Sequence, residues 1–124
     1  MTIFSKIIAG EIPSYKIYED EKTYAFLDIF PKAHGHVLVV PKIEVDKVYD
    51  LSDEDYEALF ATVKKLMKHM DEVLGTRIFV KIIGTDVPHA HVHLIPQTDE
   101  YVSGKTYEFP ESEMIEWMEK LKLA

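Results

Sequence analysis

The stretch at residues 88–96 constrains the fold more than any other part of the sequence, because histidine alternates there with small or apolar residues. In a β-strand successive side chains point to opposite faces, so His89, His91 and His93 are predicted to share one face. The alanine, valine and leucine between them then face a core. The proline at each end of the run suits the end of a strand, because proline cannot donate a ladder hydrogen bond.

Three interpretations of this histidine face follow from the residues alone. The face can be a polar strand surface, although histidine is neither a common strand residue nor cheap to bury. It can be a metal site, because neutral imidazole is the commonest metal ligand. It can also be catalytic, with one histidine as nucleophile or general base and its neighbours orienting it. The spacing does not distinguish the last two.

Length and composition limit the classes of protein. We expect residues 1–124 to form a single domain with its own core. There is no cysteine, which excludes disulfides, a thiolate nucleophile and a cysteine-based zinc site. The first residues lack the apolar run of a signal peptide, and no stretch approaches the roughly 20 apolar residues of a membrane span. The prediction is a cytoplasmic protein without membrane contact.

The net charge of the chain limits the kind of ligand that it can bind. The formal net charge is −8, and Arg77 is the only arginine. Such a surface repels long polyanions, so stable nucleic-acid binding is not expected. A small phosphorylated ligand remains compatible, because histidines, backbone N–H groups and a helix N-terminus can hold one phosphate.

Hydrophobic periodicity predicts an α+β domain. Helices are expected at residues 3–9, from the cap Ser52 to Leu74, and at Glu111–Leu121. Strands are expected at residues 15–18, Thr23–Leu27, 36–40, 77–83 and the histidine run. Residues 97–106 read as a mobile polar loop. Direct connections between most strands favour an antiparallel sheet with helices on one side.

Three polar residues outside the histidine run stand at strand ends or between strands. Asp28 follows the second strand, where an aspartate usually forms a turn; the functional alternative is a carboxylate that accepts hydrogen bonds from ribose hydroxyls. His36 stands where the third strand starts, a position that is more often structural than catalytic. His34 is expected to be only a loop residue.

The histidine run resembles the signature of the histidine-triad (HIT) family, His-x-His-x-His followed by two apolar residues. The likeness to the Hint-like branch extends to residues 3–13, 26–29, 35–42 and 87–89, which read IFSKIIAGEIP, FLDI, GHVLVVPK and VPH. Together with the histidine run, these segments are distributed over residues 2–97. The resemblance implies a HIT-like fold: a five-stranded antiparallel sheet with a long mid-chain helix, a short N-terminal helix and a C-terminal helix.

The resemblance also implies a reaction. In the family the middle histidine attacks the α-phosphorus of a nucleotide, and water resolves the nucleotidyl-histidine intermediate. His91 is then the nucleophile, His93 contacts the phosphate and the leaving group, and His89 and His36 support the imidazole. The residues implied to bind the nucleotide are Asp28 at the ribose, Ile3, Phe4, Ile7, Phe26 and Ile29 around the base, and Thr85 and Asp86 near the phosphate. No cofactor is implied; the implied partners are a purine nucleotide or nucleotide conjugate and a second copy of the chain.

The chain departs from the family pattern in two places. Many Hint-like members open with Cys-x-x-Cys and carry a histidine shortly after the Pro-Lys pair, where this chain has Thr2, Ser5 and Glu44. A structural zinc site is therefore not expected. The usual Gly-Gln pair and the upstream asparagine are replaced by a short loop of Gly84, Thr85 and Asp86, which brings a negative charge toward the phosphate.

The predicted function is a nucleotide-binding hydrolase or transferase. It would act at the α-phosphate of a nucleoside phosphoramidate or (di)nucleoside polyphosphate through a nucleotidyl-histidine intermediate. The alternative is a nucleotide-binding or protein-interaction module with the same fold and little turnover. A histidine metalloprotein is the third hypothesis.

Overall fold

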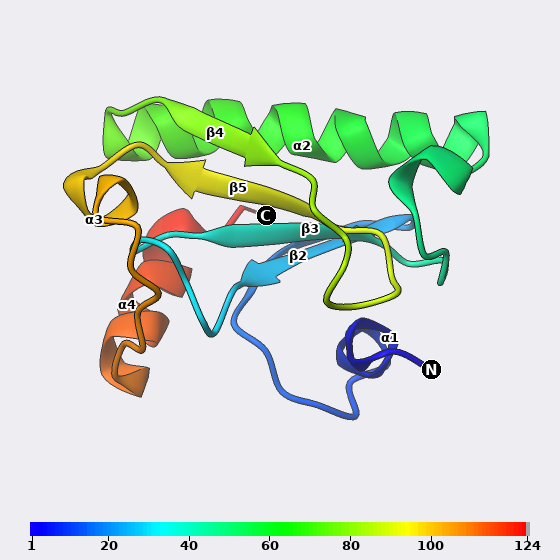
Figure 1. Ribbon diagram of the computed structural model, residues 1–124, viewed down its shortest axis with the longest axis horizontal. Coiled ribbons are helices and arrows are strands. Elements are labelled where there is room, and N and C mark those ends of the chain that lie inside the picture. The colour runs from blue at the N-terminus through cyan, green and yellow to red at the C-terminus, as the bar shows by residue number, and fades with distance from the viewer. Residues whose placement is uncertain (124) are drawn as a thin grey trace.

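A computed structural model describes residues 1–123 of the chain and shows one five-stranded sheet with helices packed on it (Figure 1). Every neighbouring pair of strands is antiparallel. From one edge to the other the strands are β1 (Lys16–Glu19), β2 (Thr23–Leu27), β3 (Val37–Pro41), β5 (Val92–Pro96) and β4 (Ile78–Lys81). The predicted fold class is thus confirmed.

The long helix α2 (Asp53–Leu74) has the ends that its sequence predicts. The Ser52 hydroxyl accepts a hydrogen bond from the Asp55 N–H, and acidic side chains fill the first turn, where the helix dipole favours them. Gly75 ends the helix with a left-handed φ of 66°, a conformation that a side chain would strain. The other helical segments are α1 (Ile3–Ile8), the 3₁₀ turn Val48–Asp50, α3 (Asp99–Val102) and α4 (Glu111–Leu121).

The two faces of the sheet are covered by different helices. The helices α2 and α4 pack on one face, over a core that includes Leu59, Leu66 and Leu121. The helix α1 packs on the opposite face through Phe4 and Ile7 and closes a second, smaller core there. The expectation of helices on one side is therefore wrong for α1, which lies below the sheet in Figure 1 while α2 lies above it. The reason is that β2 and β3 are buried on both faces, so each face needs a cover.

The strand β5 is shorter than the histidine run predicts. It begins at Val92, so only His93 lies in the ladder; His89 lies in a bend, and Ala90 and His91 have no regular secondary structure. The β3–β5 pairing ends at Val39 and Val92. Beyond that point the Ala90 N–H donates instead to the carbonyl of Val45, in the connection that follows β3. The side chains still alternate, because Ala90 and Val92 lie in the core under α2 while His91 and His93 face the other side.

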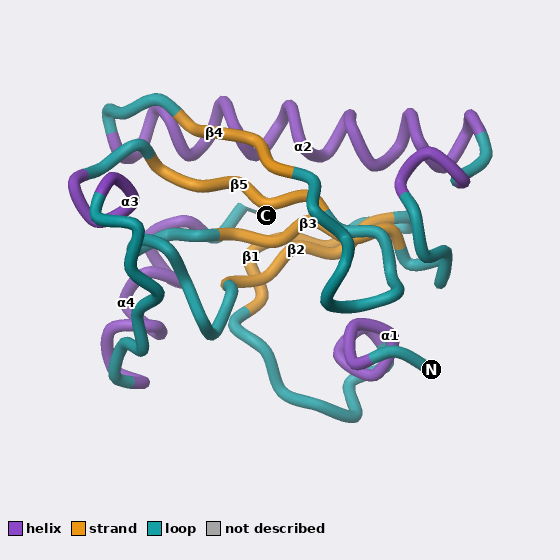
Figure 2. Tube along the Cα trace, in the orientation of Figure 1, coloured by secondary structure: helices purple, strands orange, loops and turns teal. Residues whose placement is uncertain are grey.

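The segment between β5 and α4 also differs from its prediction. Residues 97–106 were expected to be a loop, but α3 forms a short helix within them (Figure 2). Among the described residues 1–123, no helix is both long enough and apolar enough to cross a membrane.

Candidate active site

A cavity of about 300 Å³ lies on the α1 side of the sheet. Its walls come from α1, the ends of β2 and β3, and the segment between β4 and β5, which descends toward α1 in Figure 2. Most lining side chains are apolar, and the polar groups gather at one end. The lining residues are Ile3, Phe4, Ile7, Ile12, Pro13, Ser14, Phe26, Leu27, Asp28, Ile29, Phe30, Leu38, Asp86, Val87, His91 and His93. A few polar groups at one end of an apolar cavity are typical of a small-molecule site.

The His91 ring is held by a backbone carbonyl. Its Nδ1 lies 2.7 Å from the carbonyl oxygen of His89. A carbonyl oxygen can only accept, so Nδ1 carries the proton, and the neutral ring presents its lone pair at Nε2. Within residues 1–123 this Nε2 has no hydrogen-bond partner, and its nearest acid is the Asp86 carboxylate at 3.4 Å. The arrangement leaves the one nucleophilic atom of the ring facing the cavity.

His93 presents a hydrogen-bond donor to the cavity, whereas His91 presents an acceptor. The Lys32 N–H donates to Nδ1 of His36 at 3.0 Å, so the proton of that ring is on Nε2. This Nε2–H donates to Nδ1 of His93 at 2.9 Å. The proton of His93 is therefore on Nε2, which has no partner in the described chain and lies where it can donate to a ligand.

Burial keeps this pair of rings neutral. It is the main cause that lowers the pKa of His36 to about 3, with the proximity of His93 as the second cause. Burial likewise lowers the pKa of His93 to about 4, with the nearby His91 as the second cause. Near neutral pH both rings are thus uncharged, and the tautomers set by their partners persist.

The third triad member, His89, does not line the cavity. Its Nε2 donates to the carbonyl of Pro41 at 2.8 Å, so its Nδ1 must accept, and Nδ1 lies 2.9 Å from the Thr2 hydroxyl. The ring is fully buried, and burial keeps its pKa below the usual range. His89 and His36 thus stand behind the cavity, where each can orient the histidine in front of it.

Asp28 closes the polar end of the cavity. Its Oδ1 accepts from the Phe30 N–H at 2.8 Å, and its Oδ2 lies 3.6 Å from Nε2 of His36. Burial raises the pKa of this carboxyl, and the Asp86 carboxylate raises it further, against the Phe30 hydrogen bond. The free Oδ2 lone pairs can accept hydrogen bonds from a hydroxyl-bearing ligand.

Asp28, His36 and His93 bring one possible metal ligand each to within 4.8 Å of one another. However, the nitrogen that His36 offers carries the proton that it donates to His93, because its other nitrogen is taken by the Lys32 N–H. A metal ion would have to break this bond and turn the ring. The donor set therefore favours a hydrogen-bonded relay over a preformed metal site.

The predicted site residues come together with one exception. Of the predicted nucleotide-binding set, the structure does not bring Thr85 into the cavity wall; its side chain is exposed. Sequence reasoning missed several apolar lining residues, among them Ile12, Leu38 and Val87. A signal for Leu38 was available, because it pairs directly with the predicted Phe26 across β2 and β3 and shares its face.

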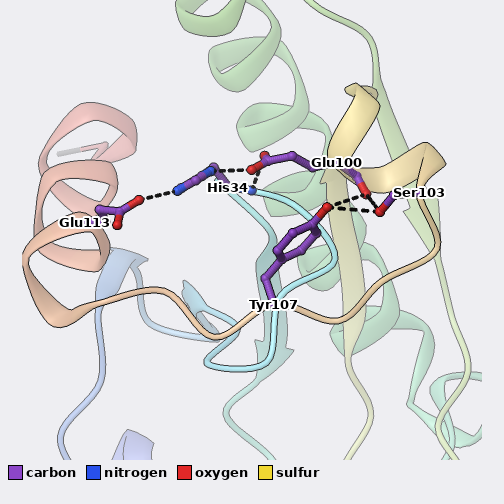
Figure 3. A network of polar contacts seen from close by, with 5 residues as sticks. All are labelled: His34, Glu100, Ser103, Tyr107 and Glu113. Atoms are coloured by element: carbon purple, nitrogen blue, oxygen red, sulfur yellow. Dashed lines mark hydrogen bonds and ion pairs between the residues drawn. The ribbon is translucent and has the colours of Figure 1, made fainter.

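His34 is in a loop as predicted, but it also connects three segments (Figure 3). Its Nδ1 lies 2.7 Å from Glu100 of α3, and its Nε2 lies 2.9 Å from Glu113 of α4. Its ring stacks on Phe109 with centroids 3.6 Å apart. Carboxylates only accept, so the ring is the donor in these contacts. The loop between Asp28 and His36 is thereby anchored from outside the cavity.

The residue after His34 must be glycine for two reasons. Gly35 has φ +82°, and a Cβ there would lie 3.2 Å from the Trp117 ring. The close approach lets α4 pack against this loop just before His36.

The positions that depart from the family pattern meet in space. Thr2, Ser5 and Glu44 form one hydrogen-bonded cluster with His89. The oxygen atoms of Thr2, Ser5 and Glu44 are hydrogen-bonded within this cluster.

Comparisons with known proteins agree with this geometry. A family model described as HIT domain matches residues 9–100. The adenosine 5'-monophosphoramidase HNT1 of Saccharomyces cerevisiae is 44% identical over 100 residues, which cover 79% of this chain and 63% of the yeast protein. The chain thus spans less than two thirds of that relative. The purine nucleoside phosphoramidase of Escherichia coli is 39% identical over 101 residues, covering 76% of this chain and 85% of the other.

Among solved structures, the HIT-like protein of Bartonella henselae described as involved in cell-cycle regulation superimposes with a TM-score of 0.86. It is 31% identical, and the match covers 98% of this chain and 94% of that one. The likeness therefore extends to α4, which lies beyond the residues matched by the family model.

Proposed function

This chain belongs to the HIT family, and from that membership we propose that it is a nucleotide hydrolase or transferase. Its substrate would be a purine nucleoside phosphoramidate or (di)nucleoside polyphosphate. It would act at the α-phosphate through a nucleotidyl adduct of His91. The observation that carries the proposal is the His91 ring, whose Nδ1–H is held by the His89 carbonyl and whose Nε2 faces the cavity.

The reaction has two displacements at phosphorus. In the first, the Nε2 lone pair of His91 forms a bond to the α-phosphorus as the bond to the leaving group breaks, and a leaving amine takes up a proton from solvent. In the second, water attacks the phosphorus, the P–Nε2 bond breaks, and the nucleoside monophosphate leaves. The Nδ1–H of His91 stays bonded to the His89 carbonyl throughout, which stabilises the positive charge of the adduct ring.

The cavity supplies positions for the rest of a nucleotide. The apolar side chains of α1 and β2 suit a purine ring, and Asp28 suits the ribose hydroxyls. The Nε2–H of His93 would donate to a phosphate oxygen or to the leaving group. These contacts position the α-phosphorus for in-line attack, which is how most of the rate of phosphoryl transfer arises.

Asp86 shapes the approach to the nucleophile. Its carboxylate lies in front of His91 Nε2, at 3.4 Å, but its side chain is 68% exposed. Repulsion from an incoming phosphate would turn it toward solvent, so we assign it to the phosphate end of the site as a gate and not as a direct ligand. The Asp86 carboxylate beside His91 Nε2 is also the observation that favours the alternative, a nucleotide-binding module with little turnover.

The decisive experiment is to trap the adduct. The protein is mixed briefly with an adenosine phosphoramidate, quenched in base, which preserves phosphoryl-histidine bonds, and digested for mass spectrometry. An adenylyl group on the peptide that contains His91 is the expected result. Nucleotide binding without adduct or product would establish the binding module instead. An adduct on another residue would reject the assignment of His91.

Asp28→Ala is expected to weaken nucleotide binding by about 10- to 100-fold with a smaller change in kcat, because hydrogen bonds to a charged group contribute about 1.5–3 kcal/mol. Affinities for adenosine monophosphate by calorimetry and KM values check this. Asp28→Asn is the matched control, since its amide oxygen can still accept from the Phe30 N–H. An unchanged affinity in Asp28→Ala would place the ribose elsewhere.

We also propose that the chain forms a homodimer through β4 and α2. The outer edge of β4 has no strand beside it in residues 1–123, and Val80, Ile82 and Ile83 are exposed on and after it. An open apolar edge is usually covered by a partner. Sedimentation velocity at micromolar concentration should show a dimer, and charged substitutions at Ile82 and Ile83 should dissociate it. A monomeric wild-type protein would contradict the proposal.

A further inference from the structure

A hydrogen-bonded cluster joins the start of α1 to the histidine run. Glu44 Oε1 accepts from the Thr2 N–H and from the Ser5 hydroxyl, each at 2.7 Å. The Thr2 hydroxyl lies 2.9 Å from His89 Nδ1, and the Ser5 hydroxyl lies 3.4 Å from the same atom. Three distant parts of the chain therefore meet at one fully buried imidazole.

The direction of each hydrogen bond in the cluster follows from its partners. His89 Nε2–H donates to the Pro41 carbonyl, so Nδ1 is an acceptor and the Thr2 hydroxyl must donate to it. The Ser5 hydroxyl donates to Glu44, because a carboxylate only accepts. The bonds from Ser5 and Thr2 hold the pKa of Glu44 below its usual range, so it stays ionised. The Thr2 hydroxyl oxygen also accepts from the Ser5 N–H at 3.1 Å, and we assign its single proton to His89 Nδ1 at 2.9 Å, which is nearer than the Ser5 hydroxyl oxygen at 3.3 Å.

We propose that Glu44, acting through Thr2 and Ser5, is a positioning residue for the reaction at His91. Together with the Pro41 carbonyl, which fixes the tautomer, it keeps the His89 ring neutral and in one orientation, and the carbonyl of His89 in turn holds the His91 ring with Nε2 toward the phosphorus. The inference rests on the proposed function of His91. Glu44 itself lies outside the cavity wall, so it does not contact a ligand there.

Two observations indicate that the cluster does more than hold α1 against the sheet. First, His89 Nδ1 is buried and depends on the Thr2 hydroxyl; without that donor the lone pair is stranded or takes up a proton, which puts a cation beside His91. Second, the Phe4 ring packs edge-on against both imidazoles, with centroids 5.8 Å from His89 and 5.0 Å from His91. A shift at the start of α1 therefore reaches both rings.

The first test reads His89 directly and needs no turnover. Long-range ¹H–¹⁵N NMR spectra of the untagged full chain, recorded over about pH 5 to 8, report which nitrogen of each histidine is protonated. In the wild type we expect His89 to stay neutral with its proton on Nε2. In Thr2→Val, which keeps the shape and removes the hydroxyl, His89 should titrate at a pH higher by about one unit or more.

Matched variants separate the effects of losing the Thr2 hydroxyl, losing the Glu44 charge and disturbing the fold. Thr2→Ser keeps the donor and should restore the wild-type spectrum. Burial lowers the pKa of His89 and the Glu44 carboxylate raises it, so Glu44→Gln, which keeps an accepting oxygen, should leave His89 neutral with its proton on Nε2. Glu44→Ala also removes the acceptor for Thr2 and Ser5, and its spectrum should show a changed environment of His89 without the upward titration shift of Thr2→Val. Ser5→Ala removes one bond to Glu44 and tests the cluster if Thr2→Val does not fold. Glu11→Ala removes an equal charge close to α1 in the chain and is the control.

The second test is kinetic. Thr2→Val and Glu44→Ala should lower kcat for an adenosine phosphoramidate by about tenfold, which is about 1.4 kcal/mol, with a smaller change in KM. A role limited to docking α1 would raise KM, since α1 lines the cavity, and would leave kcat and the His89 titration alone. That result would overturn the inference.

The two proposals fail in different ways. A wild-type protein without turnover would defeat the proposed function, while the spectra would still decide whether the cluster controls His89. A wild-type protein with turnover, together with wild-type kcat and wild-type spectra in Thr2→Val and Glu44→Ala, would defeat only the inference about Glu44.

Discussion

His91→Ala is expected to lower turnover of an adenosine phosphoramidate by at least about 10³-fold, because it removes the atom that attacks phosphorus and with it the covalent route. Nucleotide affinity should change little, since the apolar wall and Asp28 remain. Rapid-quench kinetics and calorimetry with adenosine monophosphate measure the two effects separately.

The matched control for this change is His91→Asn. The His91 ring is 1% exposed and packs against Phe4. Alanine therefore also leaves a void, and thermal unfolding should show some loss of stability. Asparagine keeps an N–H that can donate to the His89 carbonyl but has no atom at the place of Nε2. If His91→Asn turns over like the wild type, His91 is not the nucleophile.

His93→Ala is expected to lower kcat by about 10²-fold, because it removes a donor aimed at the phosphate or the leaving group but leaves the attacking atom in place. It also strands the Nε2–H of His36, which donates to His93 and is buried. We therefore expect a loss of about 1–3 kcal/mol in the free energy of unfolding, measured by urea denaturation.

His93→Gln separates these two effects. The glutamine amide can accept from His36 and still donate toward the cavity, so it should recover stability and part of kcat. The assignments of His91 and His93 would have to be exchanged if His93→Ala were inactive and formed no adduct while His91→Ala retained turnover.

Much of the fold follows from patterns that are local in the sequence. The strand Thr23–Leu27 and the helix Glu111–Leu121 have the predicted bounds, and α2 ends at Leu74 before the glycine that caps it. Helix caps, hydrophobic periodicity and chain breakers involve residues only a few positions apart, so they can be recognised in the sequence alone. The alternation of the histidine run likewise determined which face meets the core and which meets the cavity.

The sequence also determined the chemistry that was available: imidazoles in a row, no thiol, and Asp28 at the end of a strand. It left a metal site and a catalytic site open, because the same histidines can serve both. The comparisons established the family, and the hydrogen bonds around the rings favour the catalytic interpretation.

Only the tertiary structure decided what each histidine can do. A ring nitrogen donates or accepts according to its partner, and the partners come from afar: Thr2 is 87 residues from His89, and Glu100 is 66 residues from His34. No local pattern links such positions, so the sequence placed His34 only in a loop and assigned Glu44 no role beyond the loss of a zinc ligand. The alternation of the run could place three imidazoles on one side, but the tautomers, and hence the nucleophile at His91 and the donor at His93, exist only once the folded chain has brought those distant partners together.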